Sequence, residues 1–201
     1  INYSSSYFTI NKKALTVAPS NTNITYGTAS PTFTPTVTGF ISGESASNAA
    51  SYSAPTCAIS GYSATSATGS TFTISCSGGS ATNYSFTTTA TATATVVQAS
   101  LTVTADAKSV TYGQSLPSLT FVVNGWVNSQ SASTAAGYVA PTCSTSPSYT
   151  TSTAAGTSVS ITCSGGSATN YSFNYSSAAL TINKISTLTI TAANQTITYG
   201  A

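Results

Sequence analysis

Four cysteines are the side chains of this sequence with the greatest capacity for chemistry. They fall into two pairs of similar spacing, Cys57 with Cys76 and Cys143 with Cys163. A zinc site would need closely spaced Cys-x-x-Cys clusters or histidines, and the sequence contains neither. We therefore expect one disulfide within each pair, formed in an oxidising compartment. Four free buried thiols are the alternative interpretation.

Catalytic side chains are scarce. Glu44 and Asp106 are the only acidic residues, and the chain has no histidine. General acid–base catalysis needs a titratable group tuned near neutrality, and a serine nucleophile needs an adjacent base. Two separate carboxylates also cannot supply the six to eight oxygens that calcium takes. The sequence therefore predicts no enzymatic activity, no cofactor and no metal site.

Trp126 is the only tryptophan, and Phe40 is its counterpart earlier in the chain. An exposed aromatic ring beside Ser/Thr-rich loops could stack on a sugar, which makes these two residues candidate ligand-binding aromatics. The alternative, which we favour, is that the ring packs at the waist of a domain or at a junction between domains. Asn-x-Ser/Thr triplets are possible acceptors for N-linked glycosylation. The alternative is that they arise by chance and are not glycosylated in a bacterial host. They begin at Asn2, Asn23, Asn83, Asn170, Asn174 and Asn194.

Charge is nearly absent from the chain. Charged residues make up 3%, with four basic and two acidic side chains, whereas a typical domain has roughly a quarter. Nucleic acid is an unsuitable partner because phosphate neutralisation requires a basic stripe. No stretch is apolar enough to predict membrane insertion of this segment. A surface of hydroxyls and amides, together with the cysteine pairs, suits an extracellular protein at the cell surface.

The sequence repeats with a period of 86 to 87 residues. Cys-Ser-Gly-Gly-Ser-Ala-Thr-Asn-Tyr-Ser-Phe occurs at 76–86 and again at 163–173. This period is too long for a solenoid coil and long enough for a small domain with its own core. We predict complete repeats at 13–98 and 99–185, the last strands of a preceding repeat at 1–12, and the first strands of a following repeat at 186–201. The short junctions, without Gly- or Pro-rich linkers, predict an end-to-end rod.

The elements that position these residues are predicted to be strands. Apolar and small polar residues alternate in runs such as Leu15-Thr16-Val17, the signature of half-buried strands. We predict an all-β fold with about seven strands per repeat, either an Ig-like sandwich or a β-grasp-like variant. In the second repeat the strands are expected at 100–104, 108–112, 118–123, 140–145, 157–163, 170–175 and 178–183.

Several positions within this framework have specific expectations. The tyrosines that precede a recurring glycine are expected to fill the core with their hydroxyls at its rim; they are Tyr26, Tyr112 and Tyr199. The Thr/Ala-rich stretch 87–95 is expected to form a shallow edge. The segments 46–50 and 132–136 are the only helical candidates, each long enough for a single turn.

The order of these motifs resembles the MBG domain of the YGX type, a repeat of bacterial cell-surface adhesins. The resemblance is carried by Thr25-Tyr26-Gly27 with Pro31, Thr111-Tyr112-Gly113 with Pro117, Asn83-Tyr84, Asn170-Tyr171 and Leu180-Thr181-Ile182-Asn183-Lys184. It implies a large secreted protein with such modules in long arrays and without catalytic residues. Where the family usually has an acid after Tyr-Gly, this chain has Thr28, Gln114 and Ala201.

These observations favour a structural role, as the stalk or fibre of a surface adhesin whose partners are neighbouring repeats of the same parent chain or fibre. The alternative is an adhesive module that binds host or environmental glycans through Trp126 and nearby polar side chains. A third and weaker hypothesis is contact with ice or a mineral surface through the Thr/Ala ladder at 87–95.

Overall fold

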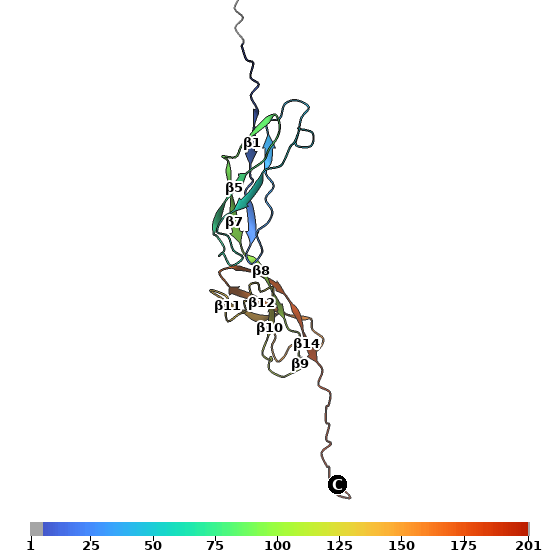
Figure 1. Cartoon of the computed structure of the whole chain (residues 1–201). Coiled ribbons are helices and arrows are strands. Elements are labelled where there is room, and N and C mark those ends of the chain that lie inside the picture. Colours follow the sequence, from blue (N-terminus) through green and yellow to red (C-terminus); the bar gives the residue numbers. More distant parts are fainter. Residues whose placement is uncertain (1–5, 201) are drawn as a thin grey trace, which may run out of the picture. The chain divides into compact units, whose positions relative to one another are not determined.

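The computed structural model describes residues 6–200, and within them the regular secondary structure consists of β-strands without a helix (Figure 1). The first repeat contains seven strands: β1 (Lys13–Ala18), β2 (Thr22–Thr25), β3 (Thr36–Thr38), β4 (Thr56–Ile59), β5 (Thr71–Ser77), β6 (Tyr84–Thr87) and β7 (Thr91–Val97). The second repeat contains seven more: β8 (Ala99–Ala105), β9 (Lys108–Thr111), β10 (Phe121–Asn124), β11 (Val139–Ser146), β12 (Val159–Ser167), β13 (Tyr171–Ser176) and β14 (Ala178–Asn183). The prediction of seven strands per repeat is confirmed.

Both repeats use the same strand order. The first repeat has a three-stranded sheet, β3-β1-β6, and a four-stranded sheet, β2-β7-β5-β4. The second has the equivalent sheets, β10-β8-β13 and β11-β12-β14-β9. In the second repeat, one hydrophobic cluster takes residues from both sheets, among them Val103, Ile161 and Leu180. Two sheets that enclose a shared core form a sandwich, in agreement with the predicted all-β class.

The alternating sequence pattern explains which side chains enter the core. In β1, Leu15 and Val17 are fully buried, and the intervening Thr16 is exposed. Leu101 and Val103 are buried in the same way in β8. Successive side chains of a strand point to opposite faces, so each Leu-Thr-Val run places two apolar groups inside and one hydroxyl outside.

The strands near the ends of each repeat pair in parallel. β2 lies alongside β7, with Thr22 opposite Ala94 and Thr25 opposite Val97. β9 lies alongside β14 in the same manner. β1 is also parallel to its neighbour β6. Each repeat therefore contains mixed sheets in which β7 or β14 has a hydrogen-bonded strand on both sides.

This arrangement corrects the expectation of a shallow edge at 87–95. The strand β7, which forms most of this stretch, is an inner strand between β2 and β5. Ala92 and Ala94 are buried, while Thr91 and Thr93 face outward. The small methyl groups do not lower burial here because strands on both sides and the core behind cover them.

The two helical candidates form turns. In the first, the Ala49 amide donates to the Ser45 carbonyl over 3.0 Å. In the second, the Ala135 amide donates to the Ser131 carbonyl over 2.9 Å. Each is a single i→i+4 turn that does not continue into a helix, as the short length of the Ala-rich segments predicts.

The chain divides into two compact units whose limits differ from those of the sequence repeats. Unit 1 contains the chain up to Ser100 together with Gly125–Tyr138 and Ser167–Ser172. Unit 2 contains Leu101–Asn124, Val139–Gly166 and the chain from Phe173 onward. Two loop segments that belong to the second repeat in sequence are therefore part of unit 1 in space.

The tyrosines before glycine differ in burial. Tyr26 is 3% exposed, so its predicted place in the core is confirmed. Tyr112 is 40% exposed and Tyr199 is fully exposed, so for these two residues the prediction is wrong. Segments 125–138 and 167–172 cover Tyr26 within unit 1. Tyr199 lies in residues 184–200, where the structure has no strand (Figure 1).

Candidate functional site

Both predicted disulfides are present. Cys57 and Cys76 are bonded across the antiparallel strands β4 and β5, where they are direct partners in register. Cys143 and Cys163 are bonded across β11 and β12. No cysteine is free. Each bond closes a loop of about the same length, so each repeat holds its four-stranded sheet together by the same covalent link.

Trp126 and Phe40 occupy equivalent aromatic clusters. The Trp126 ring meets Tyr171 edge-on, with ring centroids 5.2 Å apart, and Tyr138 at 5.5 Å. Phe40 meets Tyr84 edge-on at 5.3 Å. Trp126 is half-buried, and these edge contacts occupy its ring. Both rings therefore pack against neighbouring tyrosines, which is the arrangement that the packing interpretation expects.

The cluster at Trp126 continues into a hydrogen-bonded group that joins the two repeats inside unit 1. The Tyr171 hydroxyl donates to the Gln130 side-chain Oε1 over 2.7 Å, and the Tyr26 hydroxyl reaches the same oxygen over 3.3 Å. The Val127 amide donates to the Tyr171 hydroxyl over 3.3 Å. One amide oxygen of the second repeat thus receives a tyrosine from each repeat, and all these residues belong to unit 1.

Backbone groups extend this contact. Asn170, which is 8% exposed, accepts the Thr68 amide on its side-chain Oδ1 over 3.0 Å. Asn128 donates from Nδ2 to the Ala64 carbonyl over 3.0 Å. Both bonds satisfy loop backbone groups that would otherwise need water. Because Asn170 is buried and engaged, its Asn-x-Ser triplet is not accessible for glycosylation in this fold.

Gly27 lies at the centre of the contact. Its φ is +85°, and a Cβ added there would lie 2.3 Å from Cγ2 of Val127. Its amide donates to the Ala64 carbonyl over 3.0 Å. Glycine is required at this position for two reasons, the left-handed backbone and the close approach of a valine side chain.

A related hydroxyl–carboxylate pair lies at the opposite end of the first repeat. The Tyr84 hydroxyl donates to Glu44 Oε2 over 2.5 Å and accepts the Ile41 amide over 3.2 Å. Burial raises the pKa of Tyr84, and the hydrogen bond to Glu44 raises it further. Burial also raises the pKa of Tyr171, against the lowering effect of its hydrogen bond with Val127. Both phenols are therefore held in the neutral form.

The two carboxylates act as hydrogen-bond acceptors in separate places. Glu44 belongs to unit 1 and Asp106 to unit 2. Asp106 Oδ2 accepts the Thr120 hydroxyl over 2.5 Å.

Among residues 6–200, no three His, Cys, Asp or Glu side chains gather as metal ligands would. The same residues include no helix of sufficient length and apolarity to span a membrane.

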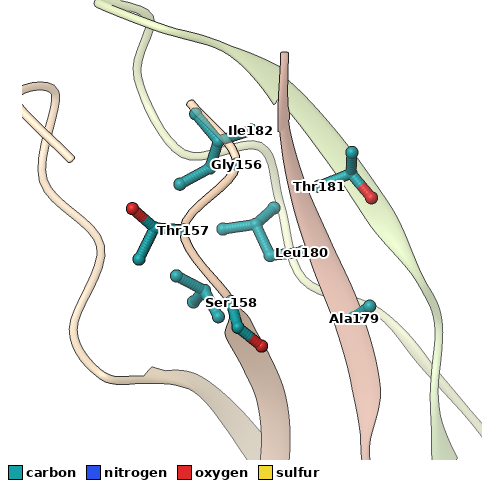
Figure 2. Close-up of a pocket in the computed structure, with 8 residues that line it drawn as sticks. Gly156, Thr157, Ser158, Ala179, Leu180, Thr181 and Ile182 are labelled. Atoms are coloured by element: carbon teal, nitrogen blue, oxygen red, sulfur yellow. The ribbon is translucent and has the colours of Figure 1, made fainter. Parts of the chain in front are cut away.

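A shallow pocket in unit 2 has little chemistry of its own. It has a volume of about 280 Å³ and lies between the loop at Gly156 and strand β14. Figure 2 shows Leu180 and Ile182 directed toward the loop and Thr181 directed the other way. Its lining consists of backbone, methyl groups and hydroxyls, without a titratable side chain. The pocket can offer hydrogen bonds and apolar contact.

Tyr26, Trp126 and Tyr171 could be singled out from the sequence, but their association and the parts played by Gln130 and Val127 could not. The recurring Tyr-Gly and Asn-Tyr motifs were the available signal, because both recur at every repeat start or end. Gln130 carried no signal beyond being the counterpart of Glu44. Two of the candidate glycosylation sites lie away from this contact. Asn2 lies outside the described residues, and Asn23 is exposed on β2.

Comparison with known proteins yields one match. A family model described as MBG domain (YGX type) matches residues 15–95 and 101–181. These two stretches coincide with β1–β7 and β8–β14 apart from the first and last residues. Searches of curated proteins and of solved structures found no match.

Proposed function

Because the chain belongs to the MBG domain (YGX type) family, we propose that it is a load-bearing stalk or fibre segment of a large secreted bacterial surface adhesin. Its tandem β domains span distance outside the cell, and its partners are neighbouring repeats of the same parent chain or fibre. The two disulfides fit an oxidising, extracellular setting.

The observation that carries this proposal is that both terminal strands of the first repeat have a parallel partner, β6 for β1 and β2 for β7. Force that enters before Lys13 pulls on the start of β1, and force that leaves after Val97 pulls on the end of β7. Each terminal strand must then slide lengthwise along its partner, which loads all hydrogen bonds between the two strands together. Antiparallel strands pulled at adjacent ends would instead separate one bond at a time.

The strand order adds a second support. The first strand, β1, lies between β3 and β6, and the last strand, β7, lies between β2 and β5. Neither strand can leave its sheet without breaking hydrogen bonds on both sides. The disulfide between Cys57 and Cys76 also keeps β4 and β5 joined after other contacts yield. These features suit a segment under tension.

Single-molecule pulling in two directions tests the mechanical part of the proposal. We expect a higher unfolding force when the chain is pulled through its ends than through handles at Thr71 and Thr95, which are opposite each other in the antiparallel β5–β7 pair. The protein is the same in both geometries, so the comparison controls for stability. Equal forces in both directions would argue against a load-bearing role.

Surface exposure is tested separately. An antibody raised against the folded, oxidised chain should label intact cells that produce it, and brief protease treatment should remove the label. Labelling only after the cells are permeabilised would contradict the localisation.

Binding of the same chain to mucin and a glycan panel tests the alternative role. Saturable binding that is lost in Trp126→Phe would favour an adhesive module.

A further inference from the structure

The two Tyr-Gly turns of the structure have the same backbone and different surroundings. Gly27 and Gly113 have φ values of +85° and +89°. A Cβ on Gly27 would collide with Val127, whereas a Cβ on Gly113 would meet nothing within 4 Å. Tyr26 is buried, and Tyr112 is 40% exposed. The Tyr-Gly surface that neighbouring segments cover in the first repeat is therefore exposed in the second repeat.

The opposite end of the first repeat shows the reverse relationship. Ile41 and Asn83 are the counterparts of Val127 and Asn170 by the repeat spacing. Asn170 is buried against the Thr68 amide, but Asn83 is exposed and borders a hollow of about 320 Å³. Ile41 is 49% exposed.

At both places a side-chain oxygen accepts a tyrosine hydroxyl. Gln130 accepts the Tyr171 hydroxyl and the Tyr26 hydroxyl. Its counterpart Glu44 accepts the Tyr84 hydroxyl through Oε2. A carboxylate has lone pairs for several donors, and a hydrogen bond to a charged acceptor is stronger than one to an amide. Glu44 is therefore suited to receive a second phenol.

We infer that Ile41, Glu44 and Asn83, the head surface, form a docking site for the Tyr-Gly end of another MBG repeat of this kind. The matching tail surface consists of Tyr112, Gly113 and Ala155, the last being the counterpart of Thr68. This inference rests on the proposed role of the chain as one segment of an array.

Each contact of the docked state has a described counterpart in unit 1. The Tyr112 hydroxyl donates to Glu44 as the Tyr26 hydroxyl does to Gln130. Ile41 covers Gly113 as Val127 covers Gly27. The Ala155 amide donates to Asn83 Oδ1 as the Thr68 amide does to Asn170.

A second copy of the chain is the probe for this surface, because one copy carries both a free head and a free tail. Such a head-to-tail contact is heterologous and can continue from copy to copy. Short covalent links give neighbouring repeats an effective concentration in the millimolar range, so the unlinked contact needs testing up to about 1 mM. Sedimentation equilibrium of the full, oxidised chain measures it.

We expect the chain to self-associate progressively, and each of two variants to weaken association by about tenfold or more. Ile41→Asp places an unpaired charge in the head surface, and Tyr112→Asp does so in the tail surface. A one-to-one mixture of these variants should form dimers only, because each retains one intact surface. Val122→Asp alters an equally exposed apolar residue outside both surfaces and should associate like the unaltered chain.

A chain that remains monomeric at about 1 mM overturns the inference. So does association that neither variant weakens, or variants that fail to form mixed dimers. These outcomes would leave the proposed stalk role intact, because surface labelling and directional pulling test that function without reference to the head and tail surfaces.

Discussion

Tyr26 and Tyr171 lie edge to face, with ring centroids 5.6 Å apart, although they belong to different repeats of the sequence. Both hydroxyls share the side-chain oxygen of Gln130. Edge-to-face aromatic pairs and buried hydrogen bonds each contribute roughly 0.5–1.5 kcal/mol. This pair therefore couples the end of the first repeat to two loops of the second within one compact unit.

Replacing the shared acceptor should weaken unit 1. We expect Gln130→Ala to lower the free energy of unfolding by about 1–3 kcal/mol, because two tyrosine hydroxyls lose their common partner. Urea unfolding followed by Trp126 fluorescence reports on this unit directly, since the only tryptophan lies within it. Gln114→Ala, at an exposed side chain, is the matched control and should change stability by about 0.5 kcal/mol or less. Equal effects would refute the coupling.

The two Tyr-Gly turns allow backbone strain to be separated from packing. Alanine at Gly113 should cost about 1–3 kcal/mol, because the left-handed backbone is unfavourable for any side chain. Alanine at Gly27 should cost about 1–3 kcal/mol more, since its methyl also collides with Val127. The difference between the two variants in urea unfolding measures the contact itself. Similar losses for both would mean that Val127 can move aside freely.

Each disulfide should stabilise its own repeat. Replacing Cys57 and Cys76 together by alanine should lower the free energy of unfolding by about 3 kcal/mol, because the bond restricts a loop of 19 residues in the unfolded chain. The same replacement at Cys143 and Cys163 should have a similar effect. In denaturant titrations, each double variant is the control for the other. A transition that neither variant shifts would show that the bonds add no stability.

Stability should fall at alkaline pH. Burial raises the pKa of Tyr84 and of Tyr171 above the ordinary value of 10.0. The folded chain therefore retains these protons when the unfolded chain has lost them. The resulting stabilisation is complete below the unfolded pKa and is lost as the pH rises through the folded pKa.

Urea midpoints measured from about pH 8 to about pH 11 test this sign. Tyr84→Phe should make the midpoint less dependent on pH, because the phenol that titrates at that site is gone. Tyr175→Phe, at a 40% exposed ring, is the control and should keep the dependence of the unaltered chain. A Tyr84→Phe variant as sensitive to alkali as the control would show that Tyr84 does not contribute.

The predicted strands agree with the structure because their signal is local. In the second repeat, the expected strand at 178–183 coincides with β14, and the one at 108–112 differs from β9 by one residue. Alternation and turn glycines act over a few residues, so a sequence displays them directly. The cysteine pairing was equally accessible, because each repeat offers one pair at a short separation.

The errors arose where burial depends on distant segments. The stretch 87–95 was expected to be an edge from its small side chains, but β2 and β5 flank β7 and bury its alanines. Tyr112 was expected in the core by analogy with Tyr26. The same Tyr-Gly motif is buried in one place and exposed in the other because only Tyr26 has Tyr171 and Gln130 against it.

Residue types and their spacing were therefore enough to predict the repeat, the all-β class, most strand positions, the disulfide pairs and the family. These properties follow from residue types at short and regular spacing, which constrain the backbone locally. The three-dimensional fold was needed to establish that β2 and β7 run in parallel, that segments 125–138 and 167–172 belong to the same unit as the first repeat, and that Gln130 accepts two tyrosine hydroxyls. These relationships are set by which remote segments share a core, and pairwise contacts between distant residues leave no periodic trace in a single sequence.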